Sequence, residues 1–401
     1  MKKIVIVLTI LISINTFAQK FEGLAETPPL GWNSWNTFGT DINEQLVKDV
    51  ADKFIELGLK DAGYEYIVLD DGWMAKERDA NGNLIADPVK FPNGMKALAE
   101  YIHAKGLKFG LYNCAGSETC AGYPGSRGYE YQDARSYASW DVDYLKYDWC
   151  NTEKLSAEGA YMTMRDALKA AGRPMVFSIC EWGDSEPWKW AKEVGHLWRV
   201  SGDIINCWDC EVGHGSWSSW GVWKIINMRK DIRKVAGPGH WNDFDMMEVG
   251  NGMTDAEDRS HFAMWSMLAS PLIMGNDLRI ASKETIKTLA NKEVIGINQD
   301  KLGIQGFRFS NENNVEVWLK PLANNEWAMT FVNMDSKPIE IDFDWEKHEI
   351  GDDLNGRRMD TKNNTFKVRD LYNHKNLGDT SNNLKVEIGV HDVLMVKLEK
   401  I

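Results

Sequence analysis

The chain has 401 residues, of which 43% are hydrophobic and 26% charged, a globular composition long enough for one large and one smaller domain. A formal net charge of −13 argues against nucleic acid or an anionic membrane as partner and favours a neutral ligand. The 18 tryptophans carry flat indole faces that suit sugar rings, which is weak support for a carbohydrate ligand.

The first eighteen residues have the pattern of a secretory signal peptide. Met1, Lys2 and Lys3 form a short positive start, residues 4–14 are an almost unbroken apolar run, and Ala18 ends a tolerable small-residue cleavage site. An apolar core of about eleven residues is short for a membrane span. We expect a signal peptide over residues 1–18 and a secreted or periplasmic mature protein without a membrane partner. The alternative is a retained anchor or a buried helix.

From about residue 25 to 300, short apolar or β-branched runs alternate with amphipathic segments, which is typical of repeated β-α units on a parallel sheet. The amphipathic segments include residues 43–57, 94–104, 161–171 and 220–235. The expected strands are 30–35, 66–69, 108–113, 144–148, 175–180, 197–201, 240–245 and 265–273. Eight such units predict an α/β fold, a catalytic (β/α)8 TIM barrel over residues 19–300.

The pattern changes after residue 300. Short strands are expected, separated by turns rich in Asn and Gly, over residues 315–319, 327–332, 339–343, 385–388 and 393–398. They predict a C-terminal antiparallel β-sandwich domain over residues 301–401. No low-complexity linker precedes it, so we expect the two domains to pack closely.

Acidic residues collect where the expected barrel strands end, and the carboxyl ends of barrel strands are where active sites are built. The acids at these strand ends or in the loops after them are Asp70, Asp71, Asp148, Glu181, Asp203, Asp243 and Asp245. A purely stabilising role would not need so many acids at one rim.

Such a ring of acids could hold a divalent cation or perform acid-base and nucleophilic chemistry on a neutral substrate. Lys146 and Arg199 each lie close in sequence to one of the acids, and nearby cations reduce the need for a metal. Strand alternation puts Lys146 and Asp148 on the same side of their strand. We therefore expect no metal at this rim.

Hydrolysis of a glycosidic bond needs two carboxyl groups on opposite sides of that bond, one ionised and one protonated. Asp148 fits the first role, because the ammonium of Lys146 should hold it ionised. Asp203 fits the second role if partial burial and the neighbouring negative charge raise its pKa.

Six motifs of the chain, in this order, resemble those of the α-galactosidase (melibiase) family, glycoside hydrolase family 27 of clan D. They are LGWNSW at 30–35, LDDGW at 69–73, LKYDWC at 145–150, CEWG at 180–183, WRVSGD at 198–203 and WNDFDM at 241–246. The resemblance covers residues 29–299, and the β domain also fits this family.

The resemblance implies a role for each matching residue. Asp148 matches the nucleophile that forms a covalent glycosyl-enzyme, and Asp203 matches the general acid and base. Asp70 and Asp71 match residues that bind the 4- and 6-hydroxyls of galactose. The full set of implied substrate contacts is Trp35, Asp70, Asp71, Tyr112, Lys146, Cys180, Glu181, Trp182, Arg199, Asp245 and Met246.

The resemblance also implies a disulfide between Cys120 and Cys150 beside the pocket, with two free buried thiols as the alternative. Cys207 and Cys210 could close a small local loop or remain reduced. Cys114 receives no functional interpretation.

The implied activity is removal of terminal α-linked galactose from oligo- or polysaccharides by an exo-acting, retaining enzyme without a cofactor. Two alternatives lie in the same family, an α-N-acetylgalactosaminidase and a β-L-arabinopyranosidase. A non-catalytic galactose-binding protein is the alternative from another functional class. The oligomeric state is left open.

Overall fold

The computed structural model describes residues 19–401, so the expected signal peptide lies outside the described part of the chain. Eight parallel strands form one sheet in the order β10-β1-β2-β3-β4-β5-β6-β9. They are β1 (Leu30–Asn33), β2 (Tyr66–Val68), β3 (Lys108–Cys114), β4 (Tyr144–Asp148), β5 (Val176–Cys180), β6 (Leu197–Arg199), β9 (Trp241–Asp243) and β10 (Leu272–Met274). A backbone bridge between Met247 and Met274 joins the segment after β9 to β10 and closes the ring. The predicted TIM-like barrel is confirmed.

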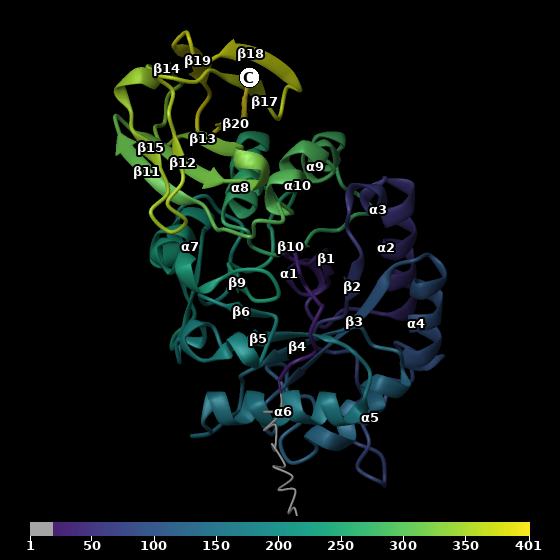
Figure 1. Cartoon of the computed structure of the whole chain (residues 1–401). Helices are drawn as coiled ribbons and strands as arrows, with labels where there is room; N and C mark the ends of the chain where they lie inside the picture. The colour runs from purple at the N-terminus through teal and green to yellow at the C-terminus, as the bar shows by residue number, and fades with distance from the viewer. Residues whose placement is uncertain (1–18) are drawn as a thin grey trace, which may run out of the picture.

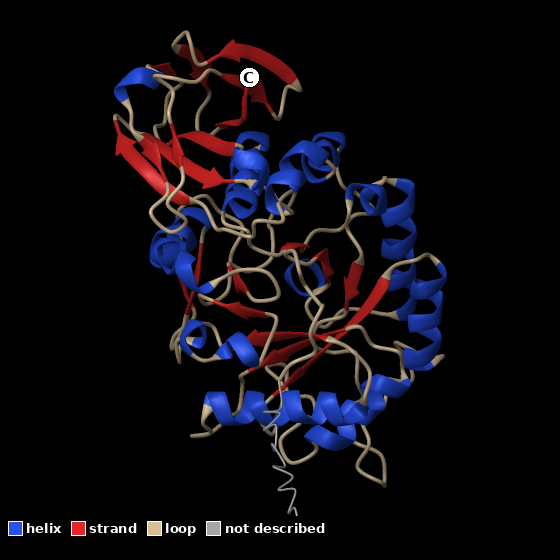
Figure 2. Ribbon diagram, viewed as in Figure 1, coloured by secondary structure: helices blue, strands red, loops and turns tan. Residues whose placement is uncertain are grey.

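Most helices surround the strands on the outside of the barrel, whereas the short α1 lies inside the ring of strands in this view (Figures 1 and 2). The helices are α1 (Trp35–Phe38), α2 (Glu44–Glu56), α3 (Leu59–Ala62), α4 (Gly94–Ala104), α5 (Glu130–Ser139), α6 (Ala157–Ala171), α7 (Val222–Arg229), α8 (Asp255–Met267), α9 (Lys283–Leu289) and α10 (Lys292–Asn298). In α2, the Asn43 side chain accepts a hydrogen bond from the Leu46 amide and so starts the helix. The buried positions Val47, Val50 and Phe54 recur every three or four residues and face the sheet. Within residues 19–401, no helix is both long and apolar enough to cross a membrane.

The eighth predicted strand, residues 265–273, was placed wrongly. A capping box between Thr254 and Glu257 starts α8, which continues through Trp265 to Met267, and the strand itself is β10 at Leu272–Met274. Residues Ser260 to Met267 are all buried, so this part of the helix shows no polar face in the sequence. An apolar run of this kind does not distinguish a buried helix from a buried strand.

Two further segments differ from the prediction in the type of secondary structure. The first strand ends at Asn33, and Trp35 already belongs to α1. The predicted helix over 220–235 is divided: Trp220 ends the short strand β8 (Ser218–Trp220), α7 follows, and residues 230–235 form a 3-10 turn.

The C-terminal part forms a six-stranded antiparallel sheet in the order β11-β12-β13-β20-β17-β18 and two separate pairs, β14 with β19 and β15 (Ile350–Gly351) with β16 (Arg358–Met359). The strands are β11 (Phe307–Glu312), β12 (Val315–Pro321), β13 (Trp327–Asn333), β14 (Ile339–Phe343), β17 (Phe366–Asp370), β18 (Lys375–Asp379), β19 (Leu384–Ile388) and β20 (Val393–Lys400). The five predicted strands correspond to β12, β13, β14, β19 and β20. The prediction missed β11, β17, β18 and the two-residue strands β15 and β16, and β18 is an exposed, polar edge strand without an apolar face.

The β domain packs on α8 of the barrel. Arg259 of α8 forms an ion pair with Asp392, the N–O distance being 2.7 Å. The ammonium of Lys320, on β12, is fully buried and donates to the Ser266 carbonyl at 2.9 Å. Burial lowers the pKa of Lys320 to about 7, because a charged ammonium loses its hydration there.

Lys320 should therefore make folding less favourable at low pH. Below pH 7 Lys320 is protonated in both states, so the full cost of burying its charge opposes folding. Above pH 7 the folded state loses this proton, whereas the unfolded state keeps it up to about pH 10.5, and the cost therefore shrinks as the pH rises. We expect Lys320→Met to raise the free energy of unfolding, by about 3 kcal/mol more at pH 6 than at pH 9. Denaturant unfolding of both proteins at the two pH values measures this difference. The exposed Lys375→Met is the control, and an equal gain at both pH values would contradict the prediction.

Candidate active site

The predicted acids come together because neighbouring parallel strands end at the same face of the barrel. In the register of the sheet, Asp148 lies beside Cys114 on one side and Cys180 on the other, and Arg199 lies beside Asp243. Asp70 follows β2 on the same face. This face is the carboxyl-terminal mouth at which barrel enzymes carry their active sites.

A buried ion pair joins β2 to β4. The Lys146 ammonium lies 2.8 Å from Oδ2 of Asp70, which also accepts a hydrogen bond from Nδ2 of Asn33 at 2.7 Å. Burial alone would lower the pKa of Lys146, but Asp70 and other negative groups raise it well above its ordinary value. Lys146 is therefore a fixed positive charge, and its direct partner is Asp70. Asn33 was not among the predicted site residues, although its place at the end of β1 was a usable signal.

Asp71 is held by the loop after β3. Its Oδ1 accepts from the Thr119 hydroxyl at 2.9 Å and its Oδ2 from the Ala121 amide at 2.8 Å. Burial raises the pKa of Asp71, which is 1% exposed. Since Cys120 lies between its two partners, Asp71 fixes the position of the neighbouring disulfide.

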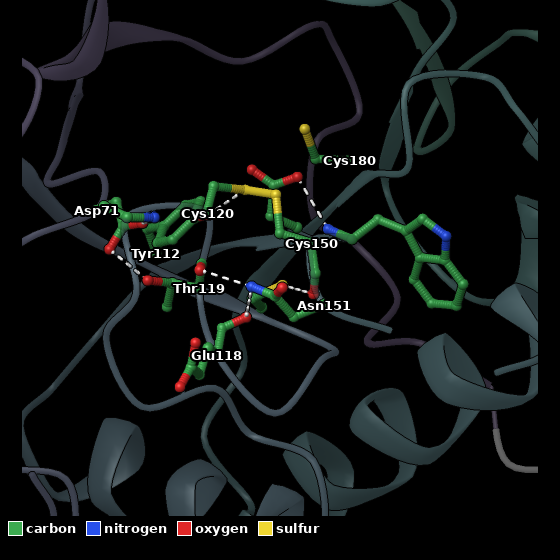
Figure 3. The surroundings of a disulfide bond; sticks show 12 residues. Asp71, Tyr112, Glu118, Thr119, Cys120, Cys150, Asn151 and Cys180 are labelled. Atoms are coloured by element: carbon green, nitrogen blue, oxygen red, sulfur yellow. Dashed lines mark hydrogen bonds between the residues drawn. A yellow bond between two sulfur atoms is a disulfide. The ribbon is translucent and has the colours of Figure 1, made fainter. Parts of the chain in front are cut away.

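The predicted disulfide between Cys120 and Cys150 is present (Figure 3). The Tyr112 hydroxyl donates to Sγ of Cys120 at 3.3 Å. Both sulfurs lie within 4.8 Å of a carboxylate oxygen of Asp148. Within residues 19–401 this is the only group of three possible metal ligands so close together, and its two sulfurs are bonded to each other rather than available as thiolates. The disulfide thus forms part of the wall around Asp148.

Asp148 is the last residue of β4 and is 6% exposed. Its Oδ1 accepts a hydrogen bond from the Trp149 amide at 2.9 Å. Burial raises its pKa to about 7, Lys146 opposes that shift, and the charges of Asp203 and Asp70 add to it. The expectation that Lys146 holds Asp148 ionised is therefore corrected: the ammonium is paired to Asp70, and burial outweighs its effect on Asp148.

Arg199 links Asp203 to Asp245. Its Nη2 lies 3.1 Å from Oδ1 of Asp203 and 2.6 Å from Oδ2 of Asp245, and its Nη1 lies 3.7 Å from Sγ of Cys180. The Arg199 side chain is 4% exposed, whereas that of Asp203 is 41% exposed. Asp203 is thus the acid of this cluster that faces solvent, and it stands beside a buried cation.

Asp245 has a strained backbone, with φ at +84°, a region that is costly for a residue other than glycine. Its Oδ2 accepts from the Ile204 amide at 2.8 Å and its Oδ1 from the Met246 amide at 2.7 Å. Burial raises the pKa of Asp245. These contacts tie the segment after β9 to the segment that carries Asp203.

Three other residues that were predicted to contact the substrate either bond to a nearby residue of their own loop or are partly exposed. Oε2 of Glu181 accepts from the Ser185 amide at 2.6 Å and from its hydroxyl at 2.7 Å, so this carboxylate holds its own loop. Trp182 is partly exposed and has a left-handed backbone with φ at +59°. Trp35 is also partly exposed, and its amide donates to Oδ1 of Asn33 at 2.8 Å. The strain at Trp182 marks the loop after β5 as a place of functional interest.

Comparison with known proteins gives one consistent result. A family model described as alpha galactosidase A matches residues 27–300, and a model of the alpha galactosidase C-terminal β sandwich domain matches residues 312–398. Alpha-galactosidase A of Cellvibrio japonicus is 52% identical, over 98% of this chain and 97% of its own. The crystal structure of α-galactosidase I from Mortierella vinacea has a TM-score of 0.87 at 37% identity, covering 94% of this chain and 98% of that one. An α-galactosidase of Saccharomyces cerevisiae, solved with raffinose, has a TM-score of 0.85 at 31% identity, over 94% and 99%.

The number of free thiols, measured in solution, tests the cysteine pairing. A second disulfide joins Cys207 to Cys210, while Cys114 and Cys180 are free and buried, and burial raises the pKa of both thiols. With a thiol-specific chromogenic reagent, we expect no reaction in the native protein, two thiols after denaturation without reductant, and six after reduction. Four or more thiols in the denatured, unreduced protein would mean that one of the two bonds does not form.

Proposed function

Because the chain belongs to the α-galactosidase family and removes terminal α-linked galactose, we propose that it does so by double displacement with Asp148 as nucleophile and Asp203 as general acid and base. The observation that carries this proposal is the pairing of one deeply buried carboxyl group, Asp148, with one solvent-facing carboxyl group, Asp203, which lies close enough for its charge to raise the pKa of Asp148. A nucleophile belongs at the bottom of a pocket, whereas a group that protonates a departing oxygen belongs where the leaving group exits.

In the first step, the Asp148 carboxylate attacks the anomeric carbon while Asp203 gives its proton to the departing oxygen. In the second step, Asp203 takes a proton from water, the water oxygen attacks the same carbon, and the bond to Asp148 breaks. Two inversions give net retention. Burial supports the first step, because a carboxylate that is poorly hydrated in the free enzyme gains more from meeting the positive charge that develops on the sugar.

The buried polar groups around Asp148 supply a binding site for one galactose. We propose that Asp70, Asp71 and Lys146 bind hydroxyls on one side of the ring, and Arg199 and Cys180 lie at the 2-hydroxyl. Trp35, Tyr112, Trp182, Asp245 and Met246 complete the wall in this proposal, and Glu181 acts by holding the loop through Ser185. The substrates are galactose-containing oligosaccharides, and we propose that polysaccharide side chains are also cleaved.

We also propose that the protein is exported. The charge and hydropathy pattern of residues 1–18 supports this, and the two disulfides fit an oxidising compartment.

Replacing each carboxyl group should produce a different product in the presence of azide. We expect Asp148→Ala to lower the rate of p-nitrophenol release from p-nitrophenyl α-galactoside by at least about 10⁴-fold. Azide that enters the space left by the carboxylate should give β-galactosyl azide. In Asp203→Ala the covalent intermediate still forms from an activated aryl galactoside, so azide should give α-galactosyl azide. NMR of the products distinguishes the two anomers.

The exposed Asp353→Ala, in the β domain, is the matched control and should keep full activity. If Asp148→Ala were active without azide, or if the anomers were exchanged between the two variants, the assigned roles would be wrong.

The pH dependence tests the electrostatic link between the two acids. In the free enzyme kcat/KM should fall as the pH drops through about 7, because protonated Asp148 cannot attack. Asp203→Asn removes a charge that raises the pKa of Asp148, so the fall should move to lower pH. The measurement uses 2,4-dinitrophenyl α-galactoside, whose leaving group needs no protonation. Asp353→Asn should leave the profile in place, and a shift of the Asp203→Asn profile to higher pH would contradict the link.

A further inference from the structure

The segment between Asp203 and α7 takes no part in the mechanism above. It contains the Cys207–Cys210 disulfide and a short antiparallel hairpin of β7 (Glu211–Gly213) and β8. We call residues 207–220 the aromatic hairpin, because Trp208, Trp217 and Trp220 lie in it.

The aromatic hairpin is bonded directly to the backbone of the proposed acid. The Trp220 amide donates to the Asp203 carbonyl at 3.0 Å, and the Ile205 amide donates to the Trp220 carbonyl at 2.9 Å. The Trp220 ring also covers Gly202, since a Cβ atom at Gly202 would lie 2.1 Å from that ring. The end of β8 therefore lies immediately beside Asp203.

The base of the aromatic hairpin is rigidly held. The disulfide closes it, and the amides of Gly221 and Val222 donate to the carbonyls of Cys210 and Cys207 at 2.8 and 3.0 Å. Trp208 stacks on Trp223 of α7 with ring centroids 4.6 Å apart. A base fixed in this way can hold the tip in one orientation relative to Asp203.

The tip carries an exposed aromatic face. Trp217 is 52% exposed, one of the large apolar side chains that the described chain leaves most open to solvent. Its ring stacks on His214 with centroids 4.1 Å apart and an interplanar angle of 27°. His214 is fixed in turn, since its Nε2 lies 2.8 Å from the Ser219 hydroxyl and its amide donates to the Trp217 carbonyl. The stability of the fold does not explain why this indole ring is held in place with one face open to water, because burial of apolar surface stabilises a protein and this face is not buried.

We propose that the aromatic hairpin binds the leaving-group side of the substrate, with Trp217 stacking on a sugar of the chain from which galactose is cleaved. This inference rests on the proposed role of Asp203: the leaving oxygen is the atom that this acid protonates, so the remaining sugars must pass the acid and the backbone bonded to it. The binding face is the indole of Trp217, which stacks on the imidazole of His214. The apolar face of a neutral sugar ring can pack flat against such an aromatic ring. The ligand is thus an oligo- or polysaccharide with several sugars beyond the cleaved bond.

The test compares a substrate without further sugars to one that has many. For the full chain, we measure kcat/KM for p-nitrophenyl α-galactoside and for a soluble galactose-substituted mannan. Trp217→Ala should lower the ratio of the mannan value to the aryl value by about three- to tenfold, the loss expected for one aromatic stacking contact. Trp217→Phe keeps a flat ring and should restore much of the ratio.

Tyr131→Ala is the matched control, because Tyr131 is an aromatic residue of similar exposure, 47%, on α5 at the outside of the barrel, and it should leave the ratio unchanged. An unchanged ratio in Trp217→Ala would overturn the inference, and so would an equal loss on both substrates, which would mean that the hairpin acts through Asp203. A wild-type protein that released no p-nitrophenol would instead refute the proposed function.

Discussion

The structure depends on a balance of charge at the mouth of the barrel, where two buried cations serve several acids. Lys146 is paired to Asp70, and Arg199 is shared by Asp203 and Asp245. A buried charge without a partner costs several kcal/mol, so neither cation can be lost without leaving a carboxylate uncompensated. Burying these charged groups together at the mouth of the barrel costs stability, because water would hydrate each of them in the unfolded chain.

Asp148 is one of the acids of the mouth that form no ion pair of their own. Its nearest ammonium is committed to Asp70, so burial sets its pKa, and the carboxylate is less stable than an exposed one would be. Asp243, also buried, has its pKa raised to about 6 but lies beside Arg199 in the sheet register. Burial is thus the largest cause of the raised pKa at both acids, and three-dimensional packing decides with which acid each cation pairs.

The sequence was sufficient for the features that follow from periodicity and from the rules of barrel architecture. The barrel strands lie at the apolar runs that alternate with helical patterns in the sequence. The acids at the ends of these runs correctly predicted the mouth of the barrel, as the positions of Asp70 and Asp148 show. It was insufficient where a side chain has two possible partners. Lys146 lies two residues from Asp148 in sequence but bonds to Asp70, which is 76 residues away.

Other features were hidden for different physical reasons. The buried part of α8 shows no polar face, because the β domain covers the side that would otherwise be exposed, and it was therefore interpreted as a strand. Glu181 has a polar partner four residues away that no periodicity signals. The β18 edge strand is polar throughout, so its pairing with β17 is visible only in the folded sheet.

The β domain is connected to the reaction centre through the helix on which it rests. Trp265 of α8 donates from its indole nitrogen to the Asp245 carbonyl at 2.8 Å, and His391 of the β domain stacks on Trp208 with ring centroids 4.8 Å apart. The β domain thus contacts the segment that follows Asp203 through His391, and α8 holds the neighbouring segment after β9 through Trp265. The two halves of this chain are consequently not independent modules: a barrel without its own β domain would keep the proposed catalytic acids but lose the stacking contact of His391 on Trp208.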